Sequence, residues 1–152
     1  MTALGLAAIV VRILLGGLFI FASVSKILDP GGFARTVFYY RLLPVSAVNL
    51  IAIILPWIEL VVGVLLVIGF KVRGAAFVAA ASLIVFTAAM VSALARGLNI
   101  DCGCFSTSGG HGVDARRIVE EIVLVAAAAF VYWTGARPRG SRLQISELKE
   151  KP

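Results

Sequence analysis

The sequence carries little charge for its length. Charged residues make up 14% of the 152 residues, against about a quarter in an ordinary soluble domain. Only two cysteines are present, which excludes a disulfide-rich secreted module. The chain is instead 61% hydrophobic, with a mean hydropathy of +1.03. A domain of this size buries only about two-thirds of the surface of its chain, so this composition excludes a typical soluble enzyme and predicts an integral membrane protein.

The basic residues are not arranged as in a nucleic-acid-binding protein. The net charge is +6, but the 14 lysines and arginines are scattered between apolar runs. Nucleic-acid recognition would need them clustered on one soluble face. Positive charge at the ends of apolar runs is typical of contact with lipid headgroups. We therefore expect the lipid bilayer, and no nucleic acid, as a partner.

Four long apolar runs predict four membrane-spanning helices. A helix needs about 20 apolar residues to cross the hydrocarbon layer, and the runs are continuous rather than alternating, which favours helices over strands. The predicted spans cover about residues 3–24, 47–70, 75–94 and 114–134. The sequence thus predicts an all-α integral membrane protein, a four-helix transmembrane bundle within residues 1–134. A polar, basic tail follows at 135–152.

The linker between the first two predicted spans has a structure of its own. It opens with the turn-like sequence Asp-Pro-Gly-Gly at 29–32. The following segment, Phe33–Leu43, combines three consecutive aromatic residues at 38–40 with two arginines. Aromatic rings and arginine stems both suit the membrane interface. We therefore predict a short interfacial helix in this segment.

The lysine and arginine counts give a weak preference for one orientation. The N-terminus, the second loop and the tail carry seven, and the first and third loops carry six. The basic turn Lys71–Gly74 and the arginines at 137, 139 and 142 favour the first group as the cytoplasmic side. We therefore expect a multi-pass membrane protein. Both termini would be cytoplasmic, and the loop that contains the cysteines would be extracytoplasmic.

Cys102 and Cys104 are separated by one glycine in the loop after the third span. A disulfide between such close neighbours departs from preferred geometry and is easily reduced. It also closes almost no chain, so it would add little stability. Thiol–disulfide exchange therefore explains the pair better than a structural role, and we treat both cysteines as candidate catalytic residues. The tolerant backbone of Gly103 would ease the ring closure.

A metal site is the alternative interpretation of the same cysteines. Two neighbouring thiolates suit a soft ion such as Cu(I) or Hg(II), and His111 in the same loop is a third candidate ligand. A closed zinc site usually needs four ligands at wider spacing. In the exchange interpretation, His111 would help to form a cysteine thiolate.

Arg12 and Glu59 interrupt the first two apolar runs. Ionisable residues inside a membrane helix are costly and are functional candidates by default. The depth of each residue in the membrane can be compared by counting residues from the centre of its run. At a rise of 1.5 Å per residue, the depths of Arg12 and Glu59 differ by less than about 2 Å. We therefore predict an intramembrane Arg12–Glu59 pair. It would fix helix register, or form a polar site for a quinone headgroup or a proton relay.

Other residues have structural interpretations. Asp114 is a candidate N-cap for the fourth span, and the spacing of Arg116 with Glu120 and of Arg117 with Glu121 predicts surface ion pairs. Small residues permit close helix packing in membranes. The glycines to which we assign this role are Gly16, Gly17 and Gly63.

Several ordered segments together resemble the MauE methylamine utilisation proteins within the wider DoxX-like membrane group. They cover about residues 10–125, most of the chain. The segments are Arg12 before Gly16-Gly17, Ser25-Lys26-Ile27-Leu28-Asp29, Tyr40-Arg41-Leu42-Leu43-Pro44, Leu55-Pro56-Trp57-Ile58-Glu59-Leu60 and Asp101-Cys102-Gly103-Cys104-Phe105.

The resemblance implies a four-helix inner-membrane protein that supports maturation of disulfide-containing extracytoplasmic proteins. In methylamine-oxidising bacteria, the implied target is the small subunit of methylamine dehydrogenase, and the implied partner is a thioredoxin-like protein. In this chain, the resemblance implies that the functional residues are Cys102, Cys104, Arg12 and Glu59. We thus expect a membrane thiol–disulfide redox protein, with thiol–disulfide oxidoreductase activity as its candidate chemistry. The alternatives are a soft-metal-ion carrier and a non-catalytic scaffold subunit of a larger membrane complex.

Overall fold

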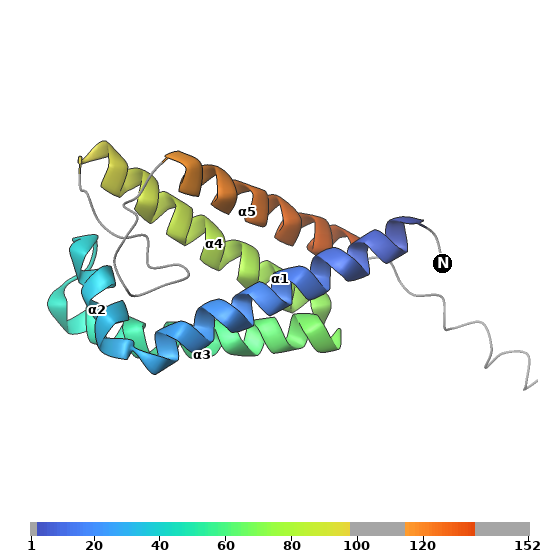
Figure 1. Cartoon of the computed structure of the whole chain (residues 1–152), viewed down its shortest axis with the longest axis horizontal. Helices are drawn as coiled ribbons and strands as arrows, with labels where there is room; N and C mark the ends of the chain where they lie inside the picture. Colours follow the sequence, from blue (N-terminus) through green and yellow to red (C-terminus); the bar gives the residue numbers. More distant parts are fainter. Residues whose placement is uncertain (1–2, 98–114, 136–152) are drawn as a thin grey trace, which may run out of the picture.

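The computed structural model describes residues 3–97 and 115–135. Within these ranges the chain is all-helical, in the order α1 (Ala3–Leu28), α2 (Pro30–Tyr39), α3 (Val45–Ile68), α4 (Val72–Ala95) and α5 (Ala115–Gly135). Four of these helices are long and apolar enough to cross a membrane, and the short α2 lies between the first two (Figure 1). The predicted fold class is therefore confirmed.

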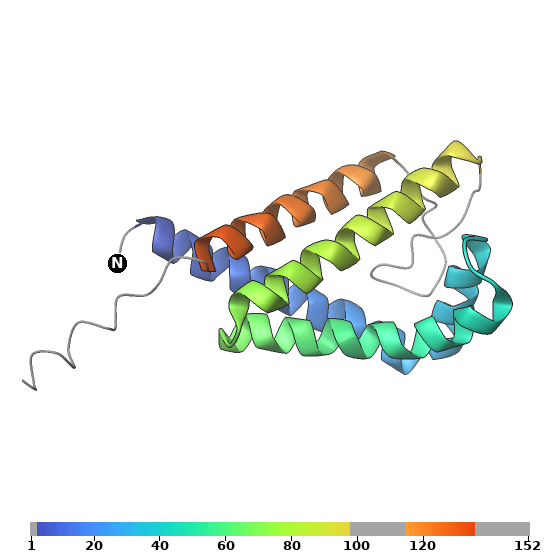
Figure 2. The same ribbon diagram turned by 180° about the vertical axis from the view of Figure 1, so that it is seen from behind.

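The long helices associate as two pairs. α1 packs along α3, and α4 packs along α5. The pairs meet where the turn between α3 and α4 joins them, and they diverge toward the end that holds α2 (Figures 1 and 2). The core between the pairs contains Leu15, Phe19 and Leu66 on one side and small residues such as Ala76 and Ala79 on the other. Because alanine side chains are small, α4 and α5 can approach each other closely along their whole length.

Glycines allow α1 and α3 to come into direct backbone contact. A Cβ on Gly16 would lie 2.8 Å from the carbonyl oxygen of Gly63, and a Cβ on Gly63 would lie 2.8 Å from that of Gly16. Both positions therefore exclude a side chain, as predicted for a close helix crossing. The prediction for Gly17 is wrong, because its Cβ would meet nothing within 4 Å.

Two helix ends differ from the sequence prediction for local reasons. The Asp-Pro-Gly-Gly segment starts α2 instead of forming a separate turn. Asp29 is its N-cap, with Oδ1 accepting a hydrogen bond from the Gly32 amide at 2.8 Å, and Pro30 occupies the first turn, where its missing N–H costs nothing. α3 ends at Ile68 because Gly69 adopts a left-handed conformation with φ of 83°, which terminates the helix.

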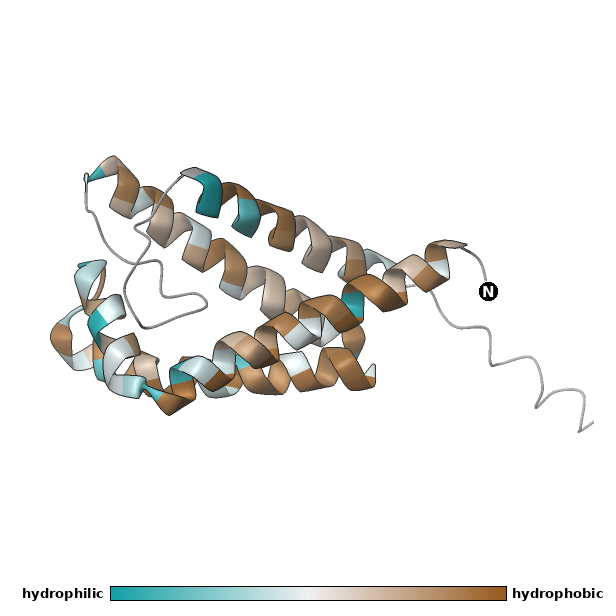
Figure 3. Cartoon of the chain, in the orientation of Figure 1, coloured by the Kyte–Doolittle hydropathy of each residue, from teal (hydrophilic) through white to brown (hydrophobic). Residues whose placement is uncertain are grey.

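Most large side chains on the long helices point outward. Figure 3 shows hydrophobic residues over all four spans, with hydrophilic ones concentrated on α2 and the start of α5. Examples of exposed apolar residues are Phe21, Trp57 and Val85. Such a surface is unsuited to water and fits a lipid environment.

Candidate functional site

The buried polar centre of the described chain is an ion pair between α1 and α3. The Lys26 ammonium donates hydrogen bonds to both carboxylate oxygens of Glu59, at 2.8 Å and 2.7 Å. The residues are only 2% and 5% exposed. The Lys26 Nζ also lies 5.1 Å from the ring centre of Phe33 and 5.0 Å from that of Phe86. The cation is thus held by a carboxylate and by two aromatic rings, which offsets part of its desolvation.

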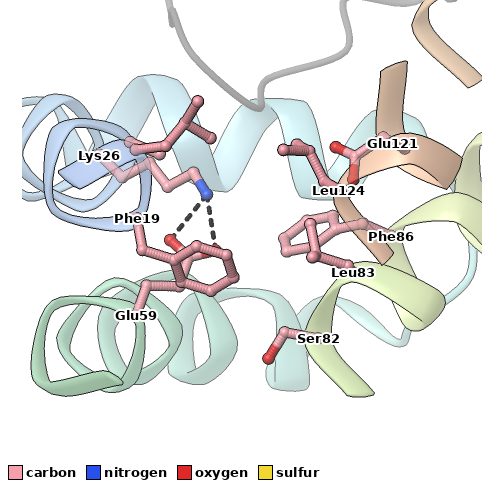
Figure 4. Close-up of a pocket in the computed structure, with 10 residues that line it drawn as sticks. Phe19, Lys26, Glu59, Ser82, Leu83, Phe86, Glu121 and Leu124 are labelled. Carbon is pink, nitrogen blue, oxygen red and sulfur yellow. Dashed lines mark hydrogen bonds and ion pairs between the residues drawn. The ribbon is translucent and has the colours of Figure 1, made fainter. Parts of the chain in front are cut away.

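A small cavity of about 30 Å³ adjoins this ion pair. Lys26 and Glu59 face it from α1 and α3, while α4 and α5 contribute Leu83, Phe86 and Glu121 on the opposite side (Figure 4). A volume of this size accommodates about two water molecules. Glu121 is itself only 4% exposed, so three ionisable side chains line one small space between the helix pairs.

The predicted pairing of Arg12 with Glu59 is wrong. Glu59 binds Lys26, whereas the guanidinium of Arg12 lies beside Gly69 at the C-terminal end of α3, where a Cβ would be 2.8 Å from Nη1. Gly69 is about 15 Å along the helix from Glu59. The Nε of Arg12 is buried and has no hydrogen-bond partner within residues 3–97 and 115–135. A cation is favourable beside the carbonyls at a helix C-terminus, which accounts for this position. Arg12 and Glu59 therefore do not form the predicted ion pair.

The reason lies in the helix crossing and in the direction of side chains. Gly63 packs between Gly16 and Ile20 of α1. Glu59 is one turn earlier on α3. Because the two helices are antiparallel, Glu59 lies level with the part of α1 that follows Ile20. Helical side chains also tilt toward the N-terminus of their own helix. In an antiparallel pair, this carries Arg12 and Glu59 apart and brings Lys26 and Glu59 together. The depth estimate from the centres of the two apolar runs includes neither the position of the helix crossing nor the tilt of the side chains.

At the start of α5, one predicted surface pair is confirmed and the other is not. Arg116 Nε donates to Glu120 Oε1 at 3.1 Å. Arg117 also binds Glu120, three residues along, at 3.1 Å, and Glu121 turns inward to the cavity. The charged start of α5 therefore has a solvent-facing part and a buried part. The candidate N-cap, Asp114, lies outside the described residues.

Sequence reasoning placed Lys26 in a loop, because the first apolar run stops at Val24. A helical signal was nevertheless present. Phe19, Ala22, Ser23 and Lys26 occupy positions i, i+3, i+4 and i+7, which lie on one helix face, and all four are buried. Lys26 therefore continues the buried face of α1 by one further turn.

The cysteine segment lies outside the described residues, which include neither Cys102 and Cys104 nor His111. The ends of its flanking helices are described. α4 ends at Ala95, where the Arg96 Nη2 donates to the Tyr40 carbonyl at 2.6 Å beside α2, and α5 begins at Ala115. Glu121 is six residues into α5, or about 9 Å along the helix. The buried ionisable cluster therefore lies toward the end of the bundle from which the cysteine segment departs.

Comparison with known proteins gives a consistent result. Residues 4–134 match the family model described as methylamine utilisation protein MauE. The chain is also 38% identical over 118 residues to methylamine utilization protein MauE of Paracoccus denitrificans. That alignment covers 77% of this chain and 63% of the relative, so the chain matches less than two-thirds of the relative's length. No solved structure matches the chain.

Proposed function

Because the chain belongs to the MauE family, we propose that it takes part in methylamine utilisation as a membrane thiol–disulfide redox protein. Cys102 and Cys104 form the exchanging pair, and the partner is a thioredoxin-like protein outside the membrane. The role is to support maturation of disulfide-containing extracytoplasmic proteins, of which the small subunit of methylamine dehydrogenase is the expected target.

The observation that carries this proposal is the Cys-Gly-Cys sequence in the segment between α4 and α5. A strained disulfide of this kind favours exchange over permanent cross-linking. The segment is attached to two helix ends on the side of α2, where Arg96 is anchored to the Tyr40 carbonyl.

The exchange is balanced by the two cysteines and the partner alone. One cysteine thiolate attacks the partner disulfide, forming a mixed disulfide and releasing the other partner sulfur as a thiolate. The second cysteine then attacks the mixed disulfide, leaving a Cys102–Cys104 disulfide and a reduced partner. Two electrons and two protons pass to the partner in this direction, and the same steps reversed oxidise it.

The charges support an orientation with both termini in the cytoplasm. Arg12, which interrupts the first apolar run, lies level with Gly69 and the Lys71–Arg73 turn, so it adds to the positive charge of that side. Lys26 is buried in an ion pair and no longer counts as a loop charge on the other side. Both changes increase the difference in positive charge between the two sides, on which the positive-inside rule is based. They support an extracytoplasmic cysteine segment.

The test combines trapping with labelling in intact cells. The single variants Cys102→Ser and Cys104→Ser should trap a covalent adduct with the partner that a reductant releases, and the double variant should trap none. A membrane-impermeant maleimide should label the wild-type cysteines only after mild reduction. If labelling occurs only after the cells are opened, the external exchange is wrong.

The two other functions give different results in the same strains. A soft-metal carrier would trap no adduct and would bind Cu(I) or Hg(II) stoichiometrically, and either serine substitution would abolish binding. A scaffold subunit would let the double serine variant restore methylamine-dependent growth to a strain that lacks the gene. Loss of growth in the double variant, together with the trapped adduct, is the result that we expect.

A further inference from the structure

An apolar groove runs along the outer side of α3 and α4, away from the buried ion pair. Its volume is about 560 Å³, within the range of about 300–1,000 Å³ that is usual for ligand sites. Trp57 and aliphatic residues of α3 form one wall, and Gly74, Ala75 and Val78 of α4 form the other. Lys71 lines the groove where α4 begins.

The two helix pairs create this groove. α3 packs mainly along α1, and α4 packs mainly along α5, so α3 and α4 diverge from the turn that joins them (Figure 2). The small residues at the start of α4 leave the space between them unfilled. A Cβ on Gly74 would meet no atom within 4 Å, so this glycine opens the groove and no packing contact requires it.

The groove has the length of one membrane leaflet. Its wall on α3 extends from Ile53 to Leu65, about 18 Å at 1.5 Å per residue. Half of a hydrocarbon layer about 30 Å thick is similar. Since Lys71 marks the headgroup level and Ile53 lies about 24 Å before Gly69 at the end of α3, the inner end of the groove lies somewhat beyond the middle of the membrane. An extended acyl chain entering beside Lys71 would fit this length.

The charge at the mouth of the groove is positive and has no carboxylate to balance it within residues 3–97 and 115–135. Lys71 and Arg73 are exposed, and Arg12 lies at the same end beside Gly69. Lys71 and Arg73 each lie over an aromatic ring, Phe70 at 5.9 Å and Tyr132 at 5.3 Å. The described acidic residues lie elsewhere: Asp29, Glu59, Glu120 and Glu121. An apolar occupant alone would leave these cations unbalanced, whereas an anionic headgroup would balance them.

We propose that this groove binds an acidic phospholipid, with an acyl chain along α3 and α4 and the phosphate beside Lys71 and Arg73. The Lys71 stem packs at the groove mouth while its ammonium reaches the headgroup region. The first amides of α4 have no side-chain cap and add hydrogen-bond donors for the phosphate. A lipid supplies the apolar chain and the negative charge in one molecule, which a second copy of this face would not. The inference does not depend on the function of the cysteines.

Trp57 provides a direct readout, because it lines the groove and the chain has only two tryptophans. With Trp133→Phe as background, the protein is placed in phosphatidylcholine vesicles that contain either brominated phosphatidylglycerol or brominated phosphatidylcholine with the same tails. Bromine in the groove quenches Trp57. We expect half-maximal quenching at a mole fraction about fivefold lower for phosphatidylglycerol, the effect of about one favourable basic contact.

Two variants separate the headgroup from the groove. Lys71→Gln should lower the preference for phosphatidylglycerol about fivefold, while Arg35→Gln, an exposed cation near the other end of the bundle, should leave it unchanged. Gly74→Leu should fill the groove and reduce quenching by both lipids without a packing clash. Soluble glycerol phosphate should not displace the lipid, because it has no acyl chain.

Three results would overturn the proposal. Equal quenching by the two lipids would show that the groove does not select charge. An unchanged preference in Lys71→Gln would place the selectivity elsewhere. A second copy in the groove would appear as a dimer in the mass of the detergent-solubilised protein, and Gly74→Leu would dissociate it without changing the lipid preference.

Discussion

Arg12 and Lys26 are both cations on α1, and among the residues that the structure describes only Lys26 meets a carboxylate. The Lys26 ammonium binds Glu59 at 2.7 Å, in a site where both residues are almost fully buried. The guanidinium of Arg12 lies beside Gly69 at the end of α3. The Gly16–Gly63 crossing separates the two positions along α1. The difference teaches that helix register and side-chain direction, and not depth alone, decide which charges meet in this bundle.

Breaking the buried pair should have the largest effect. Glu59→Gln leaves the Lys26 ammonium in an apolar site without its carboxylate, and we expect a loss of about 3–5 kcal/mol in the free energy of unfolding. Equilibrium unfolding of the purified protein in mixed micelles measures this loss. The apolar double variant Lys26→Met, Glu59→Leu should recover most of it. A Glu59→Gln protein as stable as wild type would show that the pair contributes nothing.

Disturbing the crossing should have the next largest effect. Gly63→Ala places a Cβ 2.8 Å from the Gly16 carbonyl and from the Ile20 side chain, and such overpacking costs about 1–3 kcal/mol. Gly17→Ala is the matched control, because its Cβ meets no atom. It should be neutral or stabilising by up to about 1 kcal/mol. Thermal unfolding of the two variants in the same micelles compares them, and equal costs would contradict the assigned crossing.

Arg12→Gln should have a smaller effect. The guanidinium interacts with the end of α3, a contribution of about 0.3–1 kcal/mol. In a double-mutant cycle with Glu59→Gln, the two losses should add to within about 0.5 kcal/mol, because the side chains do not meet. A coupling of several kcal/mol would restore the Arg12–Glu59 pair and would contradict the register of α1 and α3 described above.

The exposed pair at the start of α5 should matter least. The Arg116 side chain is 85% exposed, so Arg116→Ala should cost only about 0.3–0.5 kcal/mol, and added salt should remove the difference. The same unfolding measurement at low and high salt tests this. A loss near that of Glu59→Gln would remove the contrast between the surface pair and the buried pair.

The amino-acid sequence by itself determined the all-helical class and the number of long apolar helices that could span a membrane. Long continuous apolar runs leave a chain of this size no alternative to helices in lipid, and this is a local property of each run. The short helix before the second span was also foreseen. Its start was misplaced because Asp29 and Pro30 suit a helix N-terminus as well as a turn.

Only the tertiary structure decided which ionisable side chains come together. Lys26 was quoted in a family segment but was assigned to a loop, and Glu121 was assigned to a surface pair, yet both line the cavity beside Glu59. Charges within an apolar run are visible in a sequence, but their partners depend on where two helices cross. Here the close approach of Gly16 and Gly63, which leaves no room for a Cβ on either residue, sets that crossing. The tilt of each side chain toward its own N-terminus directs Glu59 to Lys26 and away from Arg12.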